Sequence, residues 1–406
     1  MTKGARFLLP AALVAAAALL AGRQGVAAPG EEEQGIHLGA GSCAAAACHG
    51  GTEPQRNEHT VWRQKDRHAQ AYLHLLGETA QRIARRLRLP RPAHEEASCL
   101  ACHGTDPAQQ RVGERFDARD GVSCELCHGG SSAWLGPHAS PGWKARDAAG
   151  KERLGMRTLS TPRSRAELCV GCHVGGPGRV VDHDLLAAGH PPLLFDAAAF
   201  TDAMPPHWTD ERDATRETWY AGQALGAAAH LEFAARAARD PRRGWPEYAL
   251  MECGSCHHEL DAAGPYALRE PPGPPGRPRL ERSSLDLIAL FLPASAAVAL
   301  PEPADRDSFA RDAEEAAGRL RSLAARMPPE GGGGLLALDA WLAGRPHLPR
   351  TTARQAAFAL RALARDRTSE PFRAAWSALE ETLREGEPFQ PEAFLAKARE
   401  LAAAGR

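Results

Sequence analysis

The chain has 406 residues and a formal net charge of −1 at pH 7, with 24% of its residues charged. That length allows one large domain or two ordinary ones. The near-neutral charge gives no reason to expect binding to nucleic acid or to a membrane surface.

Residues 1–28 have the pattern of a secretory signal peptide. Lys3 and Arg6 supply the positive start, residues 7–21 form an apolar segment, and Val26-Ala27-Ala28 is a small-residue cleavage site. The apolar segment is too short for a transmembrane helix, and no later stretch is long and apolar enough to span a bilayer. We therefore expect export, with no transmembrane segment in the mature chain.

Apolar residues recur at helical spacing between residues 57 and 89, and Pro90 and Pro92 end the pattern. We predict one helix there. His68 shares its apolar face, whereas His59, nine residues earlier, would lie about 180° around the helix. Residues 93–195 are rich in glycine, proline and short polar segments, and are expected to be largely irregular.

All ten cysteines fall in five units in which a histidine directly follows the second cysteine. The units are Cys43/Cys48/His49, Cys99/Cys102/His103, Cys124/Cys127/His128, Cys169/Cys172/His173 and Cys253/Cys256/His257. The first has the spacing C-x4-C-H, and the other four have C-x-x-C-H. A random chain of the same length and composition would be expected to contain roughly 0.01 C-x-x-C-H motifs.

C-x-x-C-H is the attachment motif of c-type haem. The two cysteines form thioethers to the haem vinyl groups, and the histidine binds the iron as the proximal axial ligand. Zinc sites or disulfides would not require a histidine after every second cysteine. We therefore predict five covalently attached haem c groups, whose propionates would make the loaded protein distinctly acidic.

Twelve of the 17 histidines lie outside these units, and a low-spin haem iron needs a second axial ligand. The strongest candidates for distal ligands are His68, His138, His183 and His190. The fifth iron could be served by His230 or His59, or by neither. His258 directly follows His257 and is expected to face a propionate or solvent.

His183 and His190 are seven residues apart, so they could share one helix face and serve two different irons. Asp182 and Asp184 could orient the His183 ring, although they could equally be solvated carboxylates.

A second helix is predicted at residues 215–239, stopped by Pro241, with Gly222 and Gly226 shortly before His230. Residues 262–284 contain the run PPGPPG and are predicted to be a stiff linker. It would join a pentahaem domain at 29–261 to a helical C-terminal domain at 285–406. In that second domain, helical patterns recur at 309–327, 352–366, 371–385 and 391–404, with a glycine break at 331–334. We interpret their apolar stripes as bundle core.

Three stretches resemble the multihaem cytochrome c-554 family: the run Gly121–Gly130 (GVSCELCHGG), the segment from Trp62 to Ala69, and Ala188-Gly189-His190-Pro191. The resemblance spans roughly residues 40–260. It implies a mainly α-helical protein with much irregular chain, wrapped around stacked haems that mostly have two histidine ligands. The fifth unit, the C-x4-C-H spacing and the C-terminal helices depart from the four-haem pattern of that family.

The resemblance implies electron transfer in the periplasm, with periplasmic or membrane-bound redox proteins as partners. We therefore expect an electron carrier rather than an enzyme. The alternative is an oxidoreductase in which one iron has an open coordination position and acts on a small nitrogen or sulfur compound. A third possibility is a subunit that docks an oxidoreductase through the C-terminal helices while relaying electrons.

Overall fold

The computed structural model describes residues 35–206, 215–257, 278–292, 298, 305–326, 333–345, 348–364, 369–384 and 389–404. The expected signal peptide, His258 and most of the predicted linker lie outside these ranges. The described residues are mainly helical with much irregular chain, as predicted. They contain isolated β-bridges but no strand, and no described helix is both long and apolar enough to cross a membrane.

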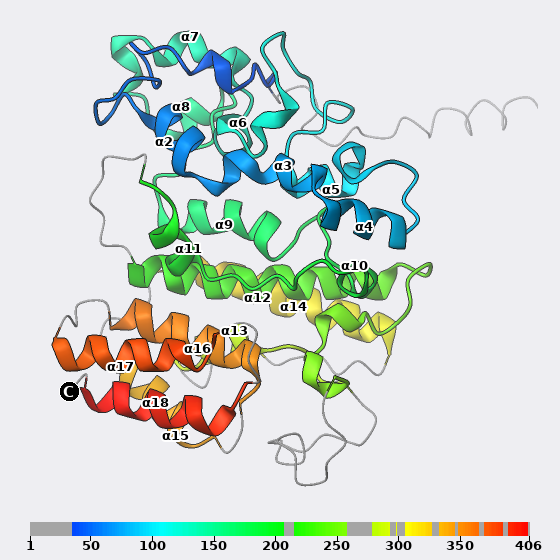
Figure 1. The fold of residues 1–406 in the computed structure, drawn as a ribbon, viewed down its shortest axis with the longest axis vertical. Coiled ribbons are helices and arrows are strands. Elements are labelled where there is room, and N and C mark those ends of the chain that lie inside the picture. The colour runs from blue at the N-terminus through cyan, green and yellow to red at the C-terminus, as the bar shows by residue number, and fades with distance from the viewer. Residues whose placement is uncertain are drawn as a thin grey trace, which may run out of the picture.

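The first half of the chain is built from short helices joined by loops (Figure 1). They are α2 (Glu58–Lys65), α3 (Ala71–Leu76), α4 (Glu78–Arg86), α5 (Ala97–His103), α6 (Cys124–His128), α7 (Leu135–His138), α8 (Ala148–Glu152), α9 (Pro162–His173), α10 (His183–Ala188) and α11 (Ala197–Ala203).

Three of these helices, α5, α6 and α9, end on the histidine of a cysteine unit. Residues three apart lie on the same side of a helix, so the last turn presents both thiols of a unit on one face. The region predicted to be irregular therefore holds its cysteine units on short helices.

The prediction of a single helix at residues 57–89 is wrong. The backbone of Asp66 is extended, with φ −87° and ψ 126°, and its carboxylate accepts the N–H of His68 to start a 3₁₀ turn at Arg67–Gln70. Gly77 is also extended, and it separates α3 from α4. A short acidic side chain that bonds its own backbone competes with helix formation, so the angular argument that separated His59 from His68 does not apply.

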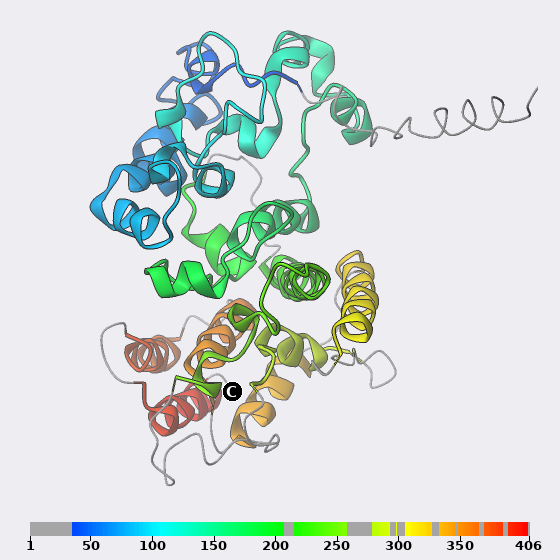
Figure 2. The ribbon, with the colours of Figure 1, turned by 90° about the vertical axis from the view of Figure 1, so that its right-hand side faces the viewer.

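Helix α12 (Thr215–Arg239) has the predicted bounds and runs through the middle of the molecule (Figures 1 and 2). It is rich in alanine, the strongest helix former, and it is buried along nearly its whole length. At Gly222 an added Cβ would lie 2.4 Å from the Cβ of Ala197, so glycine permits the close approach of α11.

The remaining helices are α13 (Ser283–Ala289), α14 (Arg306–Ala324), α15 (Gly333–Ala343), α16 (Arg350–Leu363), α17 (Glu370–Glu381) and α18 (Pro391–Ala404). The last three match the predicted helices to within a few residues. Helix α15 was not predicted, because the glycine run that seemed to break the chain contains its first residues.

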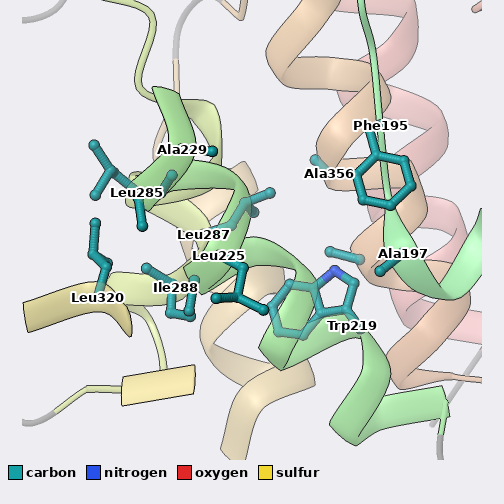
Figure 3. Close-up of a cluster of buried hydrophobic side chains, with 14 of the residues drawn as sticks. Phe195, Ala197, Trp219, Leu225, Ala229, Leu285, Leu287, Ile288, Leu320 and Ala356 are labelled. Atoms are coloured by element: carbon teal, nitrogen blue, oxygen red, sulfur yellow. The ribbon is translucent and has the colours of Figure 1, made fainter. Parts of the chain in front are cut away.

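The largest hydrophobic core joins α12 to these C-terminal helices. Figure 3 shows Trp219 and Leu225 of α12 beside Ile288 of α13, with Phe195 and Ala197 on the other side of Trp219. The core extends to Leu401 near the end of the chain, which agrees with the interpretation of the apolar stripes as core. The division into a pentahaem domain and a C-terminal domain stays a prediction.

Candidate haem-binding site

Four of the five cysteine units line one cavity of about 2070 Å³. Pockets for drug-sized ligands have volumes of about 300–1,000 Å³, so this cavity is more than twice as large. Apolar side chains such as Ile83, Leu126 and Leu168 form much of its wall. The histidines on the wall include His49, His103, His128, His173, His68, His138 and His190. The fifth unit lies outside the cavity wall, with both of its cysteines exposed.

Each of the four predicted distal histidines lies beside the histidine of one cysteine unit. The distances between ring centres are 6.0 Å for His49–His138, 6.1 Å for His173–His68, 6.5 Å for His103–His190 and 6.4 Å for His257–His183. Two imidazoles bound to one metal ion along a common axis, with metal–nitrogen bonds of about 2.0 Å, have ring centres about 6 Å apart. The four pairs are thus spaced as two axial ligands would be.

The ring planes divide these pairs into two classes. The planes are nearly parallel in His49–His138, at 18°, and in His257–His183, at 24°. They are nearly perpendicular in the other two pairs, at 80° for His68–His173 and 84° for His103–His190.

His138 is held by two tryptophans. Its ring centre lies 5.5 Å from that of Trp134 and 6.3 Å from that of Trp143, with both indoles nearly perpendicular to it. Its Nδ1 bonds the carbonyl of Leu135 at 2.6 Å, which leaves Nε2 for the side that faces His49. His138, in the segment predicted to be largely irregular, is the last residue of the short helix α7.

His183 and His190 lie at opposite ends of α10 rather than on one helix face. Gly189 adopts a left-handed conformation, with φ 114°, and ends the helix before His190. This C-cap position favours glycine because other residues are strained there. His183 begins the helix, and its backbone N–H bonds Glu247 at 3.0 Å. The two histidines lie beside the histidines of two different units, and their service to two different irons stays a prediction.

Two carboxylates that the sequence reasoning missed bond the rings of predicted ligands. Asp66 Oδ1 lies 2.9 Å from Nδ1 of His68, and Glu58 Oε2 lies 2.8 Å from Nδ1 of His49. The only sequence signal was an acidic residue close to each histidine. The bond to Asp66 raises the pKa of His68, whereas burial lowers the pKa of His173 to about 4. A neutral imidazole is the form that binds a metal.

Asp182 has a different role from the one suggested by the sequence. Its Oδ1 accepts the N–H of Leu185 at 3.0 Å and so caps α10, and its Oδ2 pairs with Arg243 at 3.0 Å. It therefore fixes the helix that begins at His183 rather than the His183 ring itself. Asp184 is exposed.

All ten cysteines have free thiols, and sulfurs of different units meet inside the cavity. Cys43 hydrogen-bonds Cys124, and Cys102 hydrogen-bonds Cys172. The second bond lowers the pKa of Cys172 to about 6 and raises the pKa of Cys102. Thioether formation would remove the thiol protons and with them these hydrogen bonds. The cysteines of different units would still lie next to each other.

Neither His230 nor His59 forms a ring pair with a unit histidine within the described ranges. His230 lies on α12, where it bonds the backbone of Leu250 and where burial lowers its pKa. His59 lines the cavity, and its ring centre lies 5.5 Å from that of Trp62. His207, another histidine outside the units, lies outside the described residues. His230 and His59 therefore stay predictions for the second ligand of an iron at His128.

These observations fit a covalently attached metal porphyrin. The cavity is large and mostly apolar, it carries cysteine pairs followed by histidines, and it brings imidazoles to the spacing of axial ligands. A flat apolar macrocycle with a central metal ion needs each of these features.

Residues 42–129, which contain the first three cysteine units, match the family model described as cytochrome c554 and c-prime. No curated protein and no solved structure matched the chain. The matched residues include all but the last residue of the Gly121–Gly130 run, and the segment from Trp62 to Ala69, two of the stretches that carried the resemblance. The match supports the cytochrome c-554 family for this part of the chain, and with it a c-type cytochrome of electron transfer that carries covalently bound haem c.

Proposed function

We propose that the protein is a periplasmic electron carrier with five closely packed haems, most of which have two histidine ligands. The axial pairs are His49 with His138, His103 with His190, His173 with His68, and His257 with His183. The observation that carries this proposal is the ring spacing of 6.0–6.5 Å in all four pairs. His128 would be the proximal ligand of the remaining iron.

Each bound haem would supply an iron that changes between the ferric and ferrous states. The chain would hold each haem by two cysteines, would supply two histidines to each of the four irons named above, and would surround the units in the cavity with apolar walls. An iron with two protein ligands has no position for a substrate, so closed sites favour electron transfer over catalysis.

The contacts between units support transfer from one haem to the next. Because Cys43 adjoins Cys124 and Cys102 adjoins Cys172, these cysteines would hold haems of different units close to one another. The fifth unit is exposed at Cys253, Cys256 and His257, so its haem is the one best placed to exchange electrons with a redox partner. The predicted signal peptide supports a periplasmic location, where such partners would be soluble or membrane-bound.

Electron paramagnetic resonance of the ferric protein tests the ligand pairs. Nearly parallel imidazole planes give a rhombic low-spin signal, whereas nearly perpendicular planes give a highly anisotropic one. We expect two irons of each kind, together with a fifth signal from the iron at His128. Mass spectrometry of the mature chain should show five haems. A mass that corresponds to four would remove the Cys43/Cys48 unit from the proposal.

A pair of variants tests the ligand assignment directly. His138→Ala should convert one low-spin iron to high-spin. His94→Ala serves as the matched control, because His94 packs against Tyr72 rather than a unit histidine and should leave all signals unchanged. Identical spectra for both variants would refute the pairing of His138 with His49. Carbon monoxide binding to the reduced wild-type protein would reveal an open iron and would favour an oxidoreductase over a carrier.

A further inference from the structure

We propose that Asp66 is a positioning residue that lowers the reduction potential of the haem held by His68 and His173. Glu58 would have the same effect, to a smaller extent, on the haem held by His49 and His138. This inference rests on the proposed function, because it takes these four histidines as axial ligands.

The carboxylate of Asp66 is held by two hydrogen bonds to His68, one from the ring and one from the backbone. Its Oδ1 lies 2.9 Å from Nδ1 of the ring and 3.0 Å from the backbone nitrogen of the same residue. Only 7% of the Asp66 side chain is exposed. With Nδ1 bound to the carboxylate, Nε2 is the nitrogen left to bind an iron on the side of His173.

Glu58 makes the corresponding contact from α2. Its Oε2 lies 2.8 Å from Nδ1 of His49, and 22% of its side chain is exposed. Water therefore screens this carboxylate more than it screens Asp66. The two contacts differ in burial and in the ligand that they reach, because Asp66 bonds a predicted distal histidine and Glu58 a predicted proximal one.

Three other predicted ligands bond neutral acceptors instead. Nδ1 of His103 bonds the carbonyl of Ala71 at 3.1 Å, and Nδ1 of His190 bonds that of Pro191 at 2.8 Å. His138, as described above, bonds the carbonyl of Leu135. The haem between His103 and His190 would therefore have a backbone acceptor on both axial rings.

A carboxylate that accepts the ring N–H increases the basicity of the nitrogen that binds the metal. A more basic ligand, and a negative charge near the iron, stabilise the ferric state relative to the ferrous state, which lowers the reduction potential. The effect grows as the local dielectric constant falls. We therefore expect the haem at His68 and His173 to have a lower potential than the haem at His103 and His190.

A nearby cation acts in the opposite direction. Arg179 lies close to Cys172, and its Nε bonds the carbonyl of Ala101 at 2.7 Å. This charge remains when Asp66 is changed, so the difference between wild type and an Asp66 variant isolates the effect of the carboxylate.

The test uses Asp66→Asn in the full haem-loaded protein, with Glu58→Gln as the matched variant. Each amide can still accept the ring N–H but carries no charge. In a spectroelectrochemical titration, Asp66→Asn should raise one of the midpoint potentials by about 59 mV, the equivalent of a tenfold change in a one-electron equilibrium. Glu58→Gln should raise a different potential by less. All irons should remain low-spin.

His68→Ala separates the possible failures. If it produces a high-spin iron, His68 is a ligand, and unchanged potentials in Asp66→Asn would then overturn this inference alone. If every iron stays low-spin in His68→Ala, His68 is no ligand, and both the assigned pair and this inference fall. A high-spin iron in Asp66→Asn would show that Asp66 only holds the ring in place, and would also overturn the effect on potential.

Discussion

Asp196 is buried between the cysteine units and the C-terminal helices. Replacing it by Asn should remove part of the pH dependence of the unfolding free energy. The residue is 1% exposed. It accepts the N–H of Ala199 at 2.9 Å, which caps α11, and it accepts a bond from Gln223 of α12 at 2.9 Å. Gln223 in turn donates to Gln355 of α16.

The magnitude follows from the pKa of this carboxyl. Burial raises it from 3.8 to about 6, against the smaller opposing effect of its hydrogen bonds. Each pKa unit corresponds to about 1.36 kcal/mol, so the difference amounts to about 3 kcal/mol. Because the folded-state pKa is the higher one, this contribution to stability is fully present below pH 3.8 and is lost as the pH rises through about 6.

The assay is guanidinium unfolding of the haem-loaded protein, followed by circular dichroism at several values of pH between about 4 and 7.5. Across that range the wild type should lose about 2.4 kcal/mol more unfolding free energy than Asp196→Asn, because part of the full difference is already lost at pH 4. Asn can still cap the helix, and other titrating groups cancel in the comparison. Asp147→Asn is the control, because exposed Asp147 caps α8 through Gly150. Parallel pH curves for wild type and Asp196→Asn would refute the reasoning.

Three further results are expected. Replacing both Cys43 and Cys48 by Ala should lower the mass of the mature protein by one haem, and an unchanged mass would contradict attachment there. Leu225→Ala should reduce the unfolding free energy by about 2–5 kcal/mol, measured by denaturant titration, because Leu225 is fully buried in the core around α12. A chain that ends at residue 261 would expose the face of α12 that packs on α13, α14 and α16. It should therefore aggregate during purification, whereas a soluble fragment that keeps its haems would favour a separate domain.

The sequence predicted the structure best where an element is determined by residues close to it in the chain. Helix α12 has its predicted bounds because a long alanine-rich segment ends at a proline, and both determinants act within a few residues. The helix predicted at 57–89 failed because periodicity does not register the competing bond that the Asp66 carboxylate accepts from the backbone N–H of His68.

The pairing of histidines depends on contacts between distant segments. His103 and His190 meet only because α5 and the end of α10 pack against the same cavity, and no local pattern encodes that contact. The four distal candidates were identifiable as histidines in suitable surroundings, but their partners were not. Asp66 and Glu58 were missed for the same reason, since each becomes significant only when a ring nitrogen lies within hydrogen-bond distance.

Helix α10 has a mechanical consequence for the fifth unit, which lies outside the shared cavity. With the proposed ligands, the six residues of α10 connect an iron at His257 to an iron at His103 through a rod about 9 Å long. Asp182 and Gly189 fix its two ends. The rate of electron tunnelling falls steeply with distance, so this rod would fix a separation on which the rate of that step depends.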